Sequence, residues 1–328
     1  MDLSIVVPVY NVEKYIRACL ESIYHQGLDE ERFEVIIVND GTQDKSIEVI
    51  DDIIRNHSNI IVINQENQGV SVARNNGIAA AKGEYILIPD PDDLLIENSL
   101  KPLLEKAIET KVDLVAADFL KFTSEEIDNF KGIVQQEITV TEKTGWNMLL
   151  EDLNPYECYV WRTLYHRQFI ICNQLSFIPS IRFQDMPFTY EVYLKAGKCL
   201  RTSWLLNIYR IGREGAATTG FDIKKAMDFG KAIGATWELT HTKGLPITIV
   251  EKLKDKIHAN MSGIIFSMHY SIHDFSEKVK VVKMLRQGVP PDMRFNHNLL
   301  QRVETILFRH LPYLYVFIRE IICKWKKH

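Results

Sequence analysis

The chain has 328 residues, which is enough for one large domain or two smaller ones. Hydrophobic residues make up 46% of it and charged residues 25%, as in a globular protein with a large core, and the net charge of −4 argues against a general affinity for nucleic acid. The five cysteines include no Cys-x-x-Cys pair, which favours reduced thiols in a cytosolic protein over a disulfide framework or a zinc site. We expect neither a signal peptide nor a membrane-spanning helix, because no basic start precedes a long apolar run and no uncharged apolar stretch reaches about 18 residues.

The N-terminal third of the chain predicts alternating strands and helices. The expected strands are Ser4–Val7, Phe33–Val38, Asn59–Ile63, Glu84–Ile88 and Val112–Ala117. The expected helices are Val12–Tyr24, Asp44–Arg55, Val70–Ala81 and Leu94–Lys111. This alternation predicts a parallel α/β sheet, in which ligands bind at the carboxyl ends of the strands.

The rest of the chain is less regular at first and then mostly helical. Residues 119–144 predict an edge hairpin or loop, and residues 145–167 predict helices. From Phe221 onward the pattern is helical, with breaks near Gly244-Leu245-Pro246 and Gly288-Val289-Pro290-Pro291.

An acidic cluster, Asp90-Pro91-Asp92-Asp93, directly follows the apolar run Tyr85–Ile88. Ionised carboxylates are costly to bury, so the cluster belongs at the exposed end of that strand, facing a cation. An extended backbone places Asp90 and Asp92 on one face, and such oxygen ligands suit Mg²⁺ or Mn²⁺ with substrate phosphates completing the shell. The alternative is an acidic turn in which Asp92 or Asp93 caps a helix from Leu94.

Four segments occur in an order that carries a family resemblance: Val6-Val7-Pro8-Val9-Tyr10-Asn11, Val38-Asn39-Asp40-Gly41-Thr42, Gly69–Gly77 and Asp90–Asp93. Together they resemble the inverting GT-A glycosyltransferases of family 2, over roughly residues 1–215. The resemblance implies a GT-A α/β fold, a mostly parallel sheet flanked by helices, with a helical C-terminal extension. It divides the chain into a catalytic domain of residues 1–215 and a helical region of residues 216–328. Within the catalytic domain, residues 1–118 would form the nucleotide-binding region and residues 119–215 the acceptor region.

The resemblance also implies a set of residues that bind the nucleotide-sugar donor: Pro8, Tyr10, Asp40, Arg74 and Asp90. Tyr10 would stack on the nucleobase and Asp40 would accept from a uracil N–H. Arg74 would donate to the uracil or a phosphate, and Asp90 would approach the ribose. The alternatives are a core tyrosine, an Asx turn or helix cap at Asp40, and a surface ion pair at Arg74.

The metal and the catalytic base follow from the same resemblance. Asp92 would coordinate a divalent metal, Mn²⁺ or Mg²⁺, with Asp93 assisting it or capping the next helix. Asp185, in Gln184-Asp185-Met186-Pro187, matches the position of the base that takes the proton of the acceptor hydroxyl. The family more often has glutamate where this chain has Gln184, and the alternative for Asp185 is a helix cap.

Three further residues match less specific segments. Arg210 or Arg213 would neutralise the diphosphate or order a lid, although the next residues lack the expected serine-rich pattern. Trp161 would stack on an acceptor sugar, and its alternative is a place in the core.

Residues 303–328 have apolar side chains at helical spacing and basic residues concentrated towards the end. This pattern predicts either peripheral contact with the inner face of the cell membrane or an amphipathic helix that packs on the protein or on a second subunit.

The sequence therefore predicts a cytoplasmic, metal-dependent inverting glycosyltransferase. It would move a sugar from a UDP-sugar to a hydroxyl of a glycan or lipid-linked oligosaccharide in capsule or O-antigen synthesis. The alternatives are a catalytically inactive glycan-binding or scaffold protein, and a nucleotidyltransferase. The latter would need a glycine-rich, lysine-containing phosphate loop, which Pro8-Val9-Tyr10-Asn11 does not supply.

Overall fold

The computed structural model describes residues 1–135, 138–213, 222–293 and 299–325. The chain packs as two compact units. The sheet unit contains Met1–Met148, Tyr159–Ser180 and Val192–Ala216, and the helical unit contains Leu149–Cys158, Ile181–Glu191 and Ala217–His328. Two short segments of the predicted acceptor region thus pack with the helical unit, and the domain boundary at residue 215 stays a prediction.

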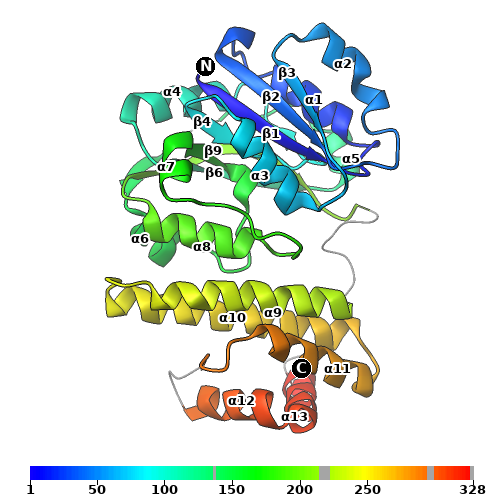
Figure 1. The fold of residues 1–328 in the computed structure, drawn as a ribbon, viewed down its shortest axis with the longest axis vertical. Helices are drawn as coiled ribbons and strands as arrows, with labels where there is room; N and C mark the ends of the chain where they lie inside the picture. Colours follow the sequence, from blue (N-terminus) through cyan, green and yellow to red (C-terminus); the bar gives the residue numbers. More distant parts are fainter. Residues whose placement is uncertain (136–137, 214–221, 294–298, 326–328) are drawn as a thin grey trace. The chain divides into compact units, whose positions relative to one another are not determined.

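The sheet unit is built on a nine-stranded sheet within the described residues (Figure 1). Its strands are β1 (Leu3–Val9), β2 (Phe33–Asn39), β3 (Ile60–Asn64), β4 (Tyr85–Leu87), β5 (Leu94–Leu95), β6 (Leu114–Phe122), β7 (Val140–Lys143), β8 (Thr163–His166) and β9 (Cys199–Arg210). The order is β3-β2-β1-β4-β8-β6-β9-β5, with β7 paired to β9. Strands β3, β2, β1 and β4 are parallel, as predicted, whereas β8, β5 and β7 pair antiparallel with their neighbours.

Helices cover both faces of this sheet. Those of the sheet unit are α1 (Ile16–Tyr24), α2 (Asp51–Asn56), α3 (Val70–Ala80), α4 (Leu100–Thr110), α5 (Ser124–Asp128), α6 (Gly145–Asn147) and α7 (Arg167–Cys172). Alternate residues of β1, such as Ile5 and Val7, join the core formed with α1 and α4. On the other face α3 lies so close to β1 that a Cβ at Gly77 would fall 2.2 Å from a methyl of Val6. Because both faces are buried, the first strands read as continuous apolar runs.

The structure confirms three predicted strands and one predicted helix, with ends that differ by no more than two residues from the predicted ones. These are Ser4–Val7, Phe33–Val38, Asn59–Ile63 and Val70–Ala81. Two other predicted helices, Val12–Tyr24 and Asp44–Arg55, begin later than expected. Hydrogen bonds to the side chains of Asp44 and Ser46 explain why both helices begin later. Ser46 Oγ accepts from Val12 N at 2.9 Å, and Asp44 accepts from Glu13 N at 2.9 Å and from Ser46 N at 3.0 Å, so these backbone N–H groups bond to side chains outside any helix.

Longer-range pairing overturns two more predictions. The predicted helix over Leu94–Lys111 is wrong at its start, because Leu94 and Leu95 form β5 against β9 and α4 begins only at Leu100. The prediction that Asp92 or Asp93 caps a helix from Leu94 is therefore wrong as well. Residues 145–167 hold short helical turns, but they end in strand β8, which fits between β4 and β6. In the predicted loop of residues 119–144, β6 continues to Phe122, and α5 and β7 follow.

The helical unit contains five long helices among its described residues: α9 (Ile223–Glu238), α10 (Ile247–Ser271), α11 (Phe275–Gly288), α12 (Leu299–His310) and α13 (Pro312–Trp325). The predicted breaks at residues 244–246 and 288–291 are confirmed, because they separate α9 from α10 and follow α11. Among the described residues we find no helix with the length and apolar character that crossing a membrane would need. Helix α8 (Asp185–Lys195) begins with residues of the helical unit and ends with residues of the sheet unit.

Candidate active site

The candidate site lies at the carboxyl edge of the parallel strands. Val9 and Asn39 end β1 and β2 as register partners, so Tyr10 and Asp40 leave the sheet side by side. β4 runs parallel to β1 and leads to Asp90. The sheet thus brings together the predicted donor residues of three separate segments, as expected for this class of sheet. Tyr10 is 43% exposed, so the alternative of a core tyrosine is wrong and its ring is accessible for stacking.

Asp40 is buried, and both of its carboxylate oxygens accept hydrogen bonds. Oδ1 accepts from Gln65 Nε2 and from Gln68 N, each at 2.8 Å, and Oδ2 accepts from Gly69 N at 2.9 Å. The next residue, Gly41, has a φ of +65°, which favours glycine. Asp40 therefore fixes the turn that leads into α3, and a contact with a uracil N–H would use its remaining lone pairs.

Arg74 extends from α3 into the interior and is only 2% exposed, so the alternative of a surface ion pair is wrong. Its Nη2 donates to Asp90 Oδ1 at 2.6 Å, and its guanidinium carbon lies 5.1 Å from the centroid of the Phe177 ring. A buried arginine thus connects α3 to the first residue of the acidic cluster, whose side chain is still 28% exposed.

Arg210, the last residue of β9, and Arg213, three residues further on, contact the other two aspartates. Arg213 forms an ion pair with Asp92 through Nε and Oδ2. Arg210 N donates to Asp93 Oδ1 at 2.8 Å, and Arg210 Nε donates to the backbone oxygen of Asp92 at 2.9 Å. Both guanidinium groups lie over the ring of Tyr15, at 4.9 Å for Arg210 and 5.7 Å for Arg213. We did not predict Tyr15, because an aromatic residue in a helix-like segment gives no local signal of this contact.

Three arginines contact the three aspartates of the acidic cluster, yet burial and mutual repulsion still raise the pKa values of two of these aspartates. Burial raises the pKa of Asp92, the charge of Asp90 raises it further, and Arg213 opposes both effects. Burial, Asp90 and Asp92 together raise the pKa of Asp93 well above its usual value. Burial followed by the same three carboxylates also raises the pKa of Tyr209. The neighbouring arginines therefore do not outweigh the cost of ionising Asp92 and Asp93 at this buried position.

These carboxylates fit a divalent cation. Asp93 Oδ2 is buried and has no hydrogen-bond partner among the described residues, and the carboxylates of Asp90 and Asp92 follow the same strand end. Within those residues, no three or more His, Cys, Asp or Glu side chains gather so as to hold a metal ion by themselves. One or two carboxylates completed by water and substrate phosphates is the usual pattern for Mg²⁺, so the donor set suits a cation that is shared with a diphosphate.

Trp161 does not lie at an open surface. It is 1% exposed and its ring contacts those of Tyr159, Phe119 and Tyr209, with centroids 4.9, 4.9 and 5.5 Å away. A ring so enclosed cannot stack on a sugar, so the structure favours the core alternative over the predicted acceptor contact.

Asp185 is the first residue of α8, and one of its carboxylate oxygens accepts from Gln184 Nε2 at 3.2 Å. It belongs to the helical unit, whereas the acidic cluster belongs to the sheet unit. Its role as a base therefore stays a prediction.

The topology and the acidic strand end define a GT-A type of nucleotide-sugar transferase fold. Comparison with known proteins agrees, because the model of the family described as "Glycosyl transferase family 2" matches residues 4–167. The chain belongs to this family and is a glycosyltransferase.

Relatives of known sequence extend the similarity to the whole chain. The glycosyltransferase EpsJ of Bacillus subtilis, itself uncharacterised, is 34% identical over 99% of this chain and 92% of its own length. The poly(ribitol-phosphate) beta-glucosyltransferase of Bacillus spizizenii is 28% identical over 66% of this chain and 33% of its own.

Solved structures share the fold. TarS 1–349 from S. aureus, in complex with UDP-GlcNAc, has a TM-score of 0.74 at 22% identity and covers 98% of this chain and 89% of its own. A mannosyltransferase from Pyrobaculum calidifontis, with GDP-Man and Mn²⁺, has a TM-score of 0.55 at 13% identity over 99% of this chain and 88% of its own.

Proposed function

We propose that this glycosyltransferase is an inverting, metal-dependent enzyme that moves a sugar from a UDP-sugar to a hydroxyl of a glycan or lipid-linked oligosaccharide. The observation that carries the proposal is the acidic cluster, in which burial and mutual repulsion raise the pKa values of Asp92 and Asp93, and in which Asp93 Oδ2 has no hydrogen-bond partner within the described part of the chain. Such a cluster calls for a cation and, through it, a diphosphate. The name of one relative, the poly(ribitol-phosphate) beta-glucosyltransferase, supports a setting in bacterial surface-polysaccharide synthesis.

The chain's own residues divide the work of donor binding. Tyr10 would stack on the nucleobase, with Asp40 and Arg74 beside it. Asp92 and Asp93 would hold the metal, which when bound would offset the charge on the leaving diphosphate. Arg210 and Arg213 already lie against these aspartates and would donate to the diphosphate oxygens.

Inversion requires the acceptor oxygen to attack the sugar carbon from the side opposite the diphosphate. In our proposal Asp185 takes the proton of the acceptor hydroxyl while the carbon–oxygen bond to the diphosphate breaks. Asp185→Asn should lower transfer by about 10²–10⁴-fold and leave UDP binding intact. Loss of UDP binding in that variant would show that the residue has another role.

The donor class is tested by calorimetric titration with UDP and with GDP, each with and without Mn²⁺. Mn²⁺-dependent binding of UDP in preference to GDP supports the proposal. A preference for GDP would keep the transferase and overturn the UDP-sugar donor. Binding of neither nucleotide would favour the inactive glycan-binding or scaffold alternative.

We also propose that α12 and α13 dock on an anionic membrane surface. Tyr315 and Val316 of α13 are buried, so one face packs within the helical unit. The exposed apolar side chains of this region are Val303, Ile306, Leu311, Tyr313, Leu314, Phe317, Ile321 and Ile322. An apolar face of this extent, in a region with basic residues, suits the boundary between lipid headgroups and acyl chains.

Co-sedimentation with vesicles of phosphatidylglycerol and phosphatidylcholine tests this docking. Phe317→Asp should release the protein from the vesicles, whereas Gln287→Asp, which adds the same charge at an exposed polar position of α11, should not. Equal binding of the two variants would overturn membrane contact through this face.

A further inference from the structure

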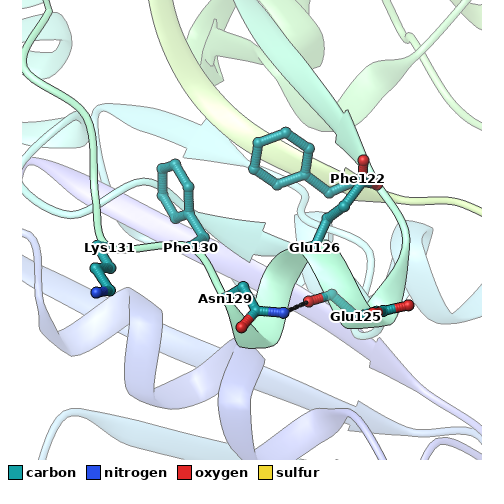
Figure 2. A pocket seen from close by; sticks show the side chains of 6 residues that line it. All are labelled: Phe122, Glu125, Glu126, Asn129, Phe130 and Lys131. Atoms are coloured by element: carbon teal, nitrogen blue, oxygen red, sulfur yellow. Dashed lines mark hydrogen bonds between the residues drawn. The ribbon is translucent and has the colours of Figure 1, made fainter.

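A groove lies where β6 ends and α5 begins (Figure 2). It is open to solvent, has a volume of about 370 Å³ and is lined by Phe122, Glu125, Glu126, Asn129, Phe130 and Lys131. We call it the α5 groove. None of its residues belongs to the set predicted for donor, metal or base, so its chemistry has no role in the donor site described above.

Hydrogen bonds connect the α5 groove to the end of β9, where Arg210 contacts the acidic cluster. Phe122, its first residue, is the register partner of Arg210 in the ladder of β6 and β9, and Ile211 N donates to Phe122 O at 2.8 Å. Ser124, which opens α5, accepts from Arg210 Nη1 at 3.0 Å. The same arginine binds Asp92 O and Asp93 Oδ1. A molecule in the groove would therefore lie beside the arginine that contacts the proposed diphosphate site.

The walls of the groove combine aromatic rings with hydrogen-bonding groups. The rings of Phe122 and Phe130 lie 5.3 Å apart, edge to face, and both are partly exposed. Glu126 is held in place because its Oε2 accepts from Thr123 N at 2.7 Å and from Thr123 Oγ1 at 2.9 Å. The amide of Asn129 donates to the Glu125 backbone oxygen at 2.8 Å, as Figure 2 shows, which fixes the turn at the end of α5.

We propose that the α5 groove binds a neutral sugar ring of the acceptor, an inference that rests on the proposed function. The C–H faces of a sugar ring pack on aromatic rings, and its hydroxyl groups donate to carboxylates and amides. The groove has two carboxylates, from Glu125 and Glu126, and one ammonium group, from Lys131. This balance disfavours a chain of phosphodiesters, so the acceptor differs in class from the poly(ribitol phosphate) in the name of one relative.

Saturation-transfer NMR tests the inference with the methyl β-glycosides of glucose, galactose and N-acetylglucosamine as probes. We expect saturation of the ring protons of at least one glycoside in the unaltered protein. Phe130→Ala should weaken that binding about threefold to tenfold, the range expected for loss of one aromatic contact. Glu125→Gln should weaken it less, because an amide still accepts a hydrogen bond.

Two matched controls keep the result specific. Asp128→Asn removes a carboxylate from the same short helix outside the groove, and Val134→Ala shortens an exposed apolar side chain a few residues further on. Neither should change the saturation. An equal signal in Phe130→Ala, or no signal from any glycoside, would overturn the proposed site.

Ribitol 5-phosphate serves as the charged probe. Tighter binding of it than of the glycosides, lost in Phe130→Ala, would overturn the neutral-sugar class while keeping the groove. All groove variants should bind UDP with Mn²⁺ as the unaltered protein does. If the unaltered protein binds no UDP, the proposed function fails, whatever the glycosides do.

Discussion

Buried carboxylates occur in both compact units, and their surroundings differ. In the sheet unit, burial and neighbouring carboxylates raise the pKa values of Asp92 and Asp93. In the helical unit, burial alone would raise the pKa of Glu304, but the hydrogen bond with His258 and the charge of Arg319 outweigh it and lower the pKa. In the first arrangement the neighbouring arginines do not outweigh burial and repulsion, whereas in the second the positive partners do.

The contacts of Glu304 show what compensation looks like. It lies 3.4 Å from His258 Nε2 and 3.3 Å from Arg319 Nη1, and it accepts from Tyr315 Oη at 3.2 Å. These partners come from α10 and α13, so one carboxylate of α12 ties three helices together. A network of this kind serves stability, whereas a cluster of carboxylates at a strand end whose pKa values stay raised is an expected feature of a site that binds a cation.

The largest effect that we predict is on metal-dependent nucleotide binding, and it distinguishes Asp92 from Glu304. Asp92→Asn should weaken Mn²⁺-dependent binding of UDP by about a hundredfold or more, since a neutral amide is a poor ligand for a hard cation. Because the substitution also removes a repelled charge, the free energy of unfolding should stay the same or rise. Calorimetry and urea denaturation measure the two quantities, with Asp29→Asn, an exposed position, as the control. Unchanged Mn²⁺-dependent binding would refute the role of Asp92.

Glu304→Gln should do the opposite. It leaves Arg319 and His258 without their negative partner, and we expect the free energy of unfolding to fall by about 2–3 kcal/mol. Urea denaturation of the protein without ligand gives this value. Glu277→Gln is the matched control, because the carboxylate of Glu277 forms an exposed ion pair with Lys280 on the same helix. This substitution should change stability by at most about 0.5 kcal/mol. An equal fall in the free energy of unfolding in the two variants would refute the structural role of Glu304.

The pattern of apolar residues along the chain was enough to predict the parallel part of the sheet. Continuous apolar runs identified the first four strands, and their parallel order placed Tyr10, Asp40 and Asp90 at one edge. Strands β5 and β8 escaped prediction because two to four residues become a strand only by pairing with distant partners such as β9.

The site was less predictable than the fold. The motif identified Arg74 and the acidic cluster, yet the burial of Trp161 depends on Tyr159, Phe119 and Tyr209 around it. Likewise the groove beside α5 arises from the side-by-side ends of β6 and β9, which no spacing along the chain reveals.

The third prediction concerns pH in the helical unit. Burial, then the charges of Lys278 and Arg319, lower the pKa of His269 from 6.5 to about 4. The unfolded chain therefore takes up a proton first, so His269 contributes stability above pH 6.5 that is lost as pH falls towards 4. We expect a loss of about 2 kcal/mol over this range, seen as faster amide exchange in α10 and α13. In His269→Asn this component of the pH dependence should disappear, and an unchanged profile would assign it to other groups.

The smallest effect that we predict concerns the ion pair between Arg213 and Asp92. Arg213 lowers the pKa of Asp92 against burial and Asp90, and it occupies the carboxylate that we assign to the metal. A cation must therefore compete with Arg213 for Asp92. Arg213→Gln should tighten the binding of Mn²⁺ alone by a few-fold, about 1 kcal/mol, because the competitor is gone. The same variant should weaken the binding of UDP in the presence of Mn²⁺, since it also loses a donor to the diphosphate.

Electron paramagnetic resonance of free Mn²⁺ measures the affinity for the metal alone, and calorimetry measures the affinity for UDP. Arg201→Gln, which removes an arginine that pairs with Asp118 within the same unit, is the matched control and should leave both unchanged. If Mn²⁺ binds Arg213→Gln more weakly than the unaltered protein, the arginine supports the metal site instead of competing for it.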